Sequence, residues 1–264
     1  MSFGATLRLL RTDAGFTLRE LAERLGVSSA YLSRVENGHD GPPTPERLVT
    51  LARLLGLVPA TLIELADRVT PFAGAWVEEN PEARELMLEI MRRNPSSLAL
   101  ARIRAFVERE LPLSDEAESA RSELRQLFSA ERVVVGLGCG TLDDALDVAA
   151  TRFPLERLPE LGRAMREREA SCPSVLGGGL AVPHLVVEGA RPSAVVVTLR
   201  RPVPCDTPDA EPVRLLVAHV HPGGRGHTRL IARLARLARL DTTRALAGER
   251  DARRLVRELL ARLG

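Results

Sequence analysis

The sequence contains no lysine, so its 37 basic residues are all arginine. Against 35 acidic residues they leave a formal net charge of +2 over 264 residues. Aromatic residues make up only 3% of the chain, too few for a platform on which single-stranded nucleic acid stacks. No apolar run approaches the roughly 18 residues that cross a bilayer. The N-terminus also lacks the basic and apolar regions of a signal peptide. We therefore expect a cytoplasmic protein with no membrane partner.

Cysteine is scarce as well. Cys139, Cys172 and Cys205 lie far apart and form no CxxC pair, which argues against a disulfide framework and a thiolate zinc cluster. Without lysine the chain cannot complete a Gly-Lys-Ser/Thr phosphate-binding loop. The pair Gly136 and Gly138 lacks the rest of a dinucleotide-binding fingerprint. We expect no cofactor and no metal.

The composition is that of a folded protein, with 45% hydrophobic and 27% charged residues. Net charge is 0 over residues 1–70, −3 over 71–130 and +5 over 131–264. Only the last part has β-branched runs alternating with helical patterns. The sequence predicts a multidomain chain: an all-α helix-turn-helix head over 1–70, a helical linker over 71–129, and an α/β domain over 130–264, the tail, with a mixed sheet flanked by helices.

The head reads as five short helices. Thr17 and Glu20 form a capping box that begins the second helix. Gly26 ends that helix, Ser28 can cap the third, and Asn37-Gly38 supplies the left-handed residues that end it. Two short helices joined by a tight turn allow the second of them to enter a major groove.

Residues 17–38 resemble the Cro/phage-repressor-like (XRE) helix-turn-helix family, and the likeness extends over about residues 3–69. It implies double-stranded operator DNA as a partner, with a backbone phosphate held near Thr17. Arg34 is the best base reader, because its fork matches the O6 and N7 atoms of guanine. Arg11 and Glu36 match a structural pair that ties the first helix to the third. The resemblance places five residues of the third helix against DNA: Ser28, Ser29, Ala30, Ser33 and Arg34.

The middle segment predicts apolar-faced helices over 82–94 and 97–110 and a third over 115–130. A single repressor-type head reads one half-site, and a two-fold operator needs a dimer. We expect these helices to form a homodimerisation element. The alternative is a spacer that packs on its neighbours.

The tail contains a histidine held in a fixed position. A helix ends near Arg168-Glu169, and glycines 177–179 let the backbone form an anion-binding nest. Pro183 keeps the residue before it extended and holds His184 at a strand end. An upstream arginine can clamp phosphate oxygens, and imidazole forms covalent intermediates, so His184 can carry a phosphoryl group.

A second histidine follows the strand-like segment 212–221. His227 begins an amphipathic helix predicted over 228–240. Because a helix N-terminus favours negative charge, His227 can lie beside a phosphoryl group on His184.

The tail resembles the enzyme IIA domain, of the fructose/mannitol/nitrogen type, of the phosphoenolpyruvate-dependent phosphotransferase system. The motifs are Arg168-Glu169, Ser174, the run 177–184, the strand entry 209–213 and the helix 227–235. The resemblance implies that His184 accepts a phosphoryl group from a phosphocarrier protein of that system, assisted by His227 and Arg168. The whole chain then reads as a transcriptional regulator whose DNA binding is modulated by phosphorylation of His184.

Other interpretations stay open. The tail can be a working phosphocarrier that the head only tethers. It can also be a degenerate interaction domain that no longer receives phosphate, which Pro173 and Leu185 suggest. Zinc bound by His219, His221 and His227 is disfavoured, because no nearby Asp, Glu or Cys completes the set.

Overall fold

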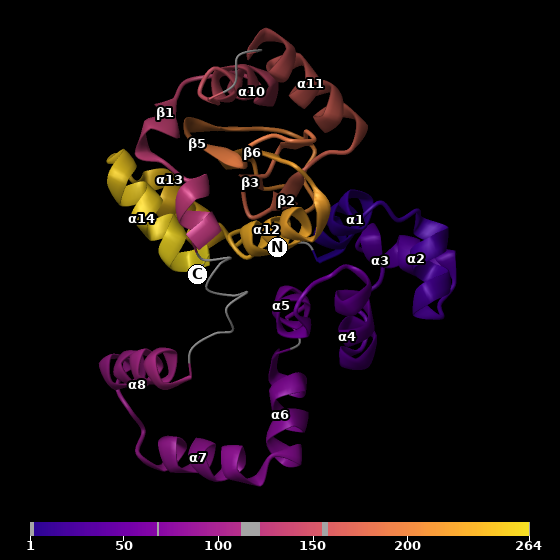
Figure 1. The fold of residues 1–264 in the computed structure, drawn as a ribbon, viewed down its shortest axis with the longest axis vertical. Coiled ribbons are helices and arrows are strands. Elements are labelled where there is room, and N and C mark those ends of the chain that lie inside the picture. Colours follow the sequence, from indigo (N-terminus) through magenta and orange to yellow (C-terminus); the bar gives the residue numbers. More distant parts are fainter. Residues whose placement is uncertain (1–2, 68, 112–121, 155–157, 264) are drawn as a thin grey trace.

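The computed structural model describes residues 3–67, 69–111, 122–154 and 158–263. Figure 1 shows a helical head beside an α/β tail, with an arm of helices running between them. The expected fold class is confirmed, since the tail is built on a mixed sheet flanked by helices.

The head consists of five helices, and their starts follow local chemistry. The capping box forms at Thr17, whose hydroxyl accepts from the Glu20 amide at 3.2 Å. Gly26 has a left-handed φ of 69° and ends the helix at the turn. Pro45 begins α4 and Pro59 begins α5, each in the first turn, where no amide is needed. The helices are α1 (Phe3–Asp13), α2 (Leu18–Leu25), α3 (Ser29–Glu36), α4 (Pro45–Leu54) and α5 (Pro59–Leu65).

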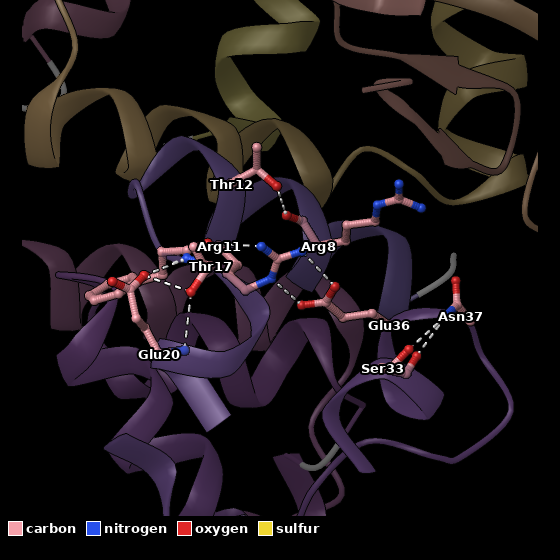
Figure 2. A network of polar contacts seen from close by, with 9 residues as sticks. Arg8, Arg11, Thr12, Thr17, Glu20, Ser33, Glu36 and Asn37 are labelled. Carbon is pink, nitrogen blue, oxygen red and sulfur yellow. Dashed lines mark hydrogen bonds and ion pairs between the residues drawn. The ribbon is translucent and has the colours of Figure 1, made fainter. Parts of the chain in front are cut away.

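An ion pair joins the first and third helices, as the family resemblance implied. Arg11 donates from Nε and Nη2 to the two carboxylate oxygens of Glu36, at 2.6 and 2.9 Å, and from Nη1 to the carbonyl of Phe16 at 2.8 Å. Figure 2 shows this two-pronged contact beside the Thr17–Glu20 box. Both partners are largely buried, so the contact fixes α1 on α3.

The arm contains α6 (Val69–Glu79), α7 (Pro81–Arg92) and α8 (Ser97–Glu110). The two helices predicted at 82–94 and 97–110 are therefore present, whereas α6 was not predicted. The helix expected over 115–130 falls partly on residues 112–121, which lie outside the described residues. Residues 122–127 are helical, and the short 3-10 turn η1 (Ala130–Arg132) leads into the sheet.

The sheet of the tail follows the order β1-β5-β6-β3-β2, with β4 also paired to β6. β5 runs antiparallel to β6, while β1 is parallel to β5, and both β3 and β4 are parallel to β6. The strands are β1 (Val133–Leu137), β2 (Val175–Gly177), β3 (Leu180–Ala181), β4 (His184–Val186), β5 (Ser193–Val203) and β6 (Val213–His221).

Helices cover both faces of this sheet (Figure 1). Because side chains alternate along a strand, Leu216 and Ala218 of β6 pack with α10 (Leu142–Ala150) and α11 (Leu158–Ser171). Leu215 and Val217 face the other way. On that side lie α12 (Gly224–Ala235), α13 (Leu240–Gly248) and α14 (Ala252–Leu263).

Two boundaries in the tail differ from the predicted ones. The helix expected over 228–240 begins at Gly224 and ends at Ala235, and α13 follows as a separate helix. His227 therefore lies inside the first turn of α12. The helix expected to end near Arg168-Glu169 continues to Ser171, so Arg168 lies in the last turn of α11.

The head and the tail share a single apolar core. Leu9 of α1 and Leu62 of α5 belong to the same cluster of buried side chains as Leu176, Leu230 and Ile231 of the tail. Helix α1 contacts α12 and β2, and α5 contacts α12. The ion pair from Arg236 Nε to Glu64 Oε1, at 3.1 Å, closes the edge of the interface.

Candidate functional site

The structure brings together the three residues expected to handle a phosphoryl group. Arg168 comes from α11, His184 from the start of β4 and His227 from the first turn of α12. The Nη2 atom of Arg168 lies 3.1 Å from Nε2 of His184. The rings of His184 and His227 are 5.1 Å apart between centroids.

The imidazole of His184 is held in one orientation. Its Nδ1 atom lies 2.8 Å from the carbonyl oxygen of Val182. A carbonyl oxygen only accepts hydrogen bonds, so Nδ1 carries the hydrogen and Nε2 is left for chemistry. Pro183, whose carbonyl accepts from the His219 amide at 2.9 Å, anchors the strand entry to β6. The side chain is 2% exposed, so the ring is correctly oriented but is shielded from solvent.

Arg168 is positioned by the end of α11. Its Nη1 atom donates to the carbonyl of Cys172 at 2.6 Å. The next residue, Glu169, accepts from the amide and the hydroxyl of Ser174 at 2.7 and 2.6 Å. Burial raises the pKa of Glu169, although these two hydrogen bonds oppose the shift. This buried contact ties the end of α11 to the loop before β2 and aims the guanidinium at His184.

The glycine turn has a different role from the one predicted. Gly177, Gly178 and Gly179 all have positive φ, at 90°, 59° and 78°. The amide of Gly178 donates to the carboxylate of Asp209 at 2.6 Å. A Cβ on Gly178 would lie 2.4 Å from the carbonyl oxygen of Ala238. The turn thus holds an internal carboxylate on the Gly178 amide and lets two backbones approach closely.

A buried histidine that was not predicted as a site residue lies beside the other two. His219 pairs with His184 in the strand register, and their rings stack with centroids 5.0 Å apart. Burial and the neighbouring histidines lower the pKa of His219 well below its usual value. Burial, followed by the charge of His184, lowers the pKa of His227 to about 4. Both rings are therefore neutral near pH 7.

An acidic side chain from the head completes the cluster. The Oδ1 atom of Asp13, at the end of α1, lies 3.0 Å from Nη2 of Arg168. Its Oδ2 atom lies 3.0 Å from Nε2 of His184 and 3.9 Å from Nε2 of His227. Burial alone would raise the pKa of Asp13, but the contact with His184 and the positive charges around the carboxylate lower it. No feature of the sequence predicted a contact between Asp13 and the tail.

The cluster suits an anion better than a metal ion. Asp13, His184 and His227 present one ligand atom each within 4.8 Å of one another, and this donor set would suit zinc. However, Arg168 Nη2 already contacts both Asp13 Oδ1 and His184 Nε2. A dication at these atoms would meet the fixed positive charge of a guanidinium, whereas an anion gains from it. The set that the sequence disfavoured for zinc, His219, His221 and His227, also differs from the one found among the described residues.

The face of α3 that was expected to read DNA is accessible. Ser29, Ala30 and Arg34 are exposed. Two hydroxyls serve the helix itself: Ser28 Oγ accepts from the Tyr31 amide at 3.1 Å, and Ser33 Oγ accepts from Asn37 Nδ2 at 3.3 Å.

Neighbouring charges occupy the two anchor points proposed for DNA. Arg34 donates to both oxygens of Asp40, at 3.0 and 2.8 Å. Exposed ion pairs of this kind are weak, so a guanine edge can replace the carboxylate. At the start of α2, the Glu20 carboxylate accepts from the Thr17 amide at 2.8 Å, where a phosphate was expected.

Comparisons with known proteins match the two ends of the chain separately. Residues 2–66 match the family model described as "Helix-turn-helix domain". Residues 126–260 match that of "Phosphoenolpyruvate-dependent sugar phosphotransferase system, EIIA 2". Because the second match covers more than half of the 264 residues, the chain belongs to this EIIA family, and it carries a helix-turn-helix domain in front.

The curated relatives match the head, whereas the solved structures match the tail. The "HTH-type transcriptional repressor RghR" of Bacillus subtilis (strain 168) is 37% identical over 83 residues, or 31% of this chain. The chain spans only 56% of that relative's length. Among solved structures, nitrogen regulatory protein IIA-Ntr from Neisseria meningitidis is 20% identical, with a TM-score of 0.46 over 51% of this chain and 97% of its own. IIA mannitol from Escherichia coli is 25% identical, with a TM-score of 0.43 over 52% of this chain and 99% of its own.

No helix in the described part of the chain has both the length and the apolarity to cross a membrane.

Proposed function

We propose that this chain is a DNA-binding transcriptional regulator whose activity depends on phosphorylation of His184. The head reads a double-stranded operator through α3. The tail accepts a phosphoryl group from a phosphohistidine on a donor protein of the phosphotransferase system. His184 is the acceptor, Arg168 the anion clamp and His227 the neighbouring polar group.

One observation carries the proposal for the tail. His184 has its Nδ1 hydrogen committed to Val182, so Nε2 is the nitrogen left to react, and it lies 3.1 Å from Arg168 Nη2 and 3.0 Å from Asp13 Oδ2. Its lone pair is free to attack once the Asp13 carboxylate has moved away. A nucleophilic nitrogen beside a fixed guanidinium is the arrangement that phosphoryl transfer needs.

The transfer step balances without any further reactant. The Nε2 lone pair attacks phosphorus, and the donor's P–N bond breaks, with its electron pair returning to the donor imidazole. The hydrogen on Nδ1 stays in place against the Val182 carbonyl and stabilises the charged ring. Arg168 neutralises the oxygens of the transferred group.

The proposal for the head rests on exposure. Ser29, Ala30 and Arg34 face solvent on a helix that follows a tight turn, which is how a recognition helix is presented to the major groove. Thr17 at the start of α2 lies where a backbone phosphate can bind, once the Glu20 carboxylate has released the Thr17 amide.

The arm supplies the element for a homodimer. Apolar side chains of α7 and α8 are unusually exposed: Leu86 63%, Met91 64%, Leu98 73% and Phe106 55%. Large apolar side chains exposed together on neighbouring segments of a chain favour a protein–protein contact. A second copy of the chain fits best, because an operator with two half-sites needs two heads.

The first test is the intact mass of the purified protein after incubation with phosphoenolpyruvate, enzyme I and the histidine phosphocarrier, with His184→Ala alongside. We expect an acid-labile phosphate adduct on the unaltered chain and none on the variant. Absence of the adduct, with the same donors active on another acceptor, would show that the tail is a degenerate interaction domain. Rapid onward transfer to a sugar-specific partner, without any effect on DNA binding, would favour a tethered phosphocarrier.

A further inference from the structure

Helix α1 has two buried faces. Leu7 and Leu10 lie on one of them, whereas Thr6, Leu9 and Asp13 follow a second line at spacings of three and four residues. Thr6 and Leu9 are 0% and 1% exposed, although a helix on the surface of an isolated head would leave this line in water. The contacts of α1 with α12 and β2 cover it.

The second face ends in the candidate site. Asp13 is the last residue of α1, and its carboxylate enters the cluster formed by Arg168, His184 and His227. A carboxylate resembles a phosphoryl group in the properties that such a cluster recognises, since both are anions with several acceptor oxygens. The head thus places a carboxylate at the position where the proposed function requires a phosphoryl group.

We infer, on the basis of the proposed function, that the head occupies the phosphoacceptor site through Asp13. Docking of α1 and phosphorylation of His184 exclude each other. Phosphoryl transfer therefore releases the head from the tail, and docking shields His184 from its donor.

Geometry makes the two states incompatible. A phosphoryl group bonded to Nε2 needs the space that Asp13 Oδ2 fills at 3.0 Å. It also brings about 1.5 to 2 negative charges against a buried carboxylate. The Nη2 atom of Arg168 already lies 3.0 Å from Asp13 Oδ1, so the carboxylate competes with the new oxygens for the guanidinium.

The same contact limits access from outside. His184 is 2% exposed and His227 is 0% exposed in the docked chain, so a donor protein reaches the acceptor only when the head has moved away. Phosphorylation then draws on the open fraction alone, which lowers the apparent rate in proportion to that fraction.

Docking also fixes the DNA-reading helix in space. Ser29, Ala30 and Arg34 stay exposed while α1 is docked, so the tail does not cover them. In a dimer, docked heads hold the two α3 helices at a fixed separation, whereas released heads must be oriented at a cost in free energy when they bind. The docked, unphosphorylated chain is therefore the tighter operator binder.

The test compares full-length Asp13→Asn and Asp13→Arg with wild type. Glu23→Gln, which changes an exposed carboxylate of α2, serves as the matched control. Two readouts are followed: the rate of phosphorylation by the phosphocarrier, and hydrogen–deuterium exchange of peptides from α1 and α12. We expect Asp13→Asn to be phosphorylated at least about fivefold faster than wild type. Asp13→Arg should expose α1 and α12 without phosphate, and stoichiometric phosphorylation should expose them in wild type.

The outcomes distinguish failure of the docking inference from failure of the proposed function. Equal phosphorylation rates in all four proteins, with unchanged exchange in α1 and α12 on phosphorylation, would overturn the docking inference and leave His184 as the acceptor. Failure of every protein to accept phosphate, with donors active elsewhere, would overturn the proposed function and the inference with it. Faster phosphorylation of Glu23→Gln as well would show that head charge in general, and not Asp13, sets the rate, and this would also overturn the inference.

Discussion

The carboxylate of Asp13 lies 3.0 Å from Nε2 of His184 and joins the last residue of α1 in the head to the first residue of β4 in the tail. Burying a carboxylate costs free energy unless it is paired, and here Arg168 supplies the pairing at 3.0 Å. The head and the tail are therefore in direct contact at His184, without any intervening linker.

Replacing Arg168 should cripple phosphoryl transfer. Arg168→Ala removes the anion clamp beside Nε2, and we expect the rate of phosphorylation to fall by ~100-fold, as for loss of a preorganised donor. Arg168→Lys keeps the charge but loses the planar fork, and should recover only part of the rate. The measurement is single-turnover phosphorylation followed by intact mass.

Arg163→Ala is the matched control, since Arg163 lies on α11 with its side chain 70% exposed. It should be phosphorylated like wild type. A wild-type rate in Arg168→Ala would remove Arg168 from the site.

Acidification should destabilise the protein between pH 6.5 and about 4. The unfolded chain protonates His227 with a pKa near 6.5, whereas in the folded chain the pKa is about 4. The unfolded state therefore binds more protons in this window, and stability falls as the pH falls. The ceiling for this residue is about 3 kcal/mol, and His219 acts in the same direction.

The measurement is urea unfolding at pH 7.5 and pH 5, with His227→Asn alongside. The variant should be less sensitive to the change in pH, whatever its absolute stability. The pKa of Asp13 is lowered in the folded chain, so its stabilising effect on the fold is fully present above its ordinary pKa of 3.8. That effect is lost only at lower pH and does not interfere with the comparison between pH 7.5 and pH 5. An identical pH dependence in His227→Asn and wild type would contradict the assignment.

Substitutions at Arg34 and Asp40 should act in opposite directions on DNA. Arg34→Ala removes the best base reader, and affinity for an operator selected from random sequence should fall by ~10-fold, with relaxed base preference. Asp40→Asn frees the guanidinium from its carboxylate partner and should strengthen binding.

Fluorescence anisotropy at fixed salt checks both, because phosphate contacts depend on salt. Arg53→Ala removes the same charge from an exposed position of α4 and should weaken all sequences alike. If Arg34→Ala affects DNA binding no differently from Arg53→Ala, Arg34 is not the residue through which α3 reads bases.

The arm should determine the oligomeric state. Phe106→Glu places a charge on the exposed apolar face of α8, and we expect a dimeric protein to become monomeric in sedimentation equilibrium. Arg84→Glu alters charge at an exposed position of α7 and should leave the dimer intact. A wild-type chain that is monomeric at operator-binding concentrations would assign α7 and α8 to another partner.

Local chemistry in the sequence predicted much of what the structure contains. The capping box at Thr17, the Arg11–Glu36 pair and the strand entry at Pro183 depend on neighbours or on well-defined motifs, and all three are present. The convergence of Arg168, His184 and His227 followed from a resemblance that spans the whole tail.

What the sequence did not predict depends on packing between distant elements. The helix predicted from residue 228 begins at Gly224 instead, because tertiary contacts outweigh the low helix propensity of glycine. The second buried face of α1, which includes Thr6 and Leu9, was not predicted. Nothing in the sequence specified what would cover it, so the role of Asp13 became visible only in the structure.

The most direct test of the account is the operator affinity of the full-length chain before and after stoichiometric phosphorylation, with His184→Ala carried through the same treatment. The account predicts that phosphorylation weakens binding of the wild-type chain by ~10-fold, within the usual range of coupling between two sites, and leaves His184→Ala unchanged. Equal affinities of the fully phosphorylated and unphosphorylated chains would contradict it.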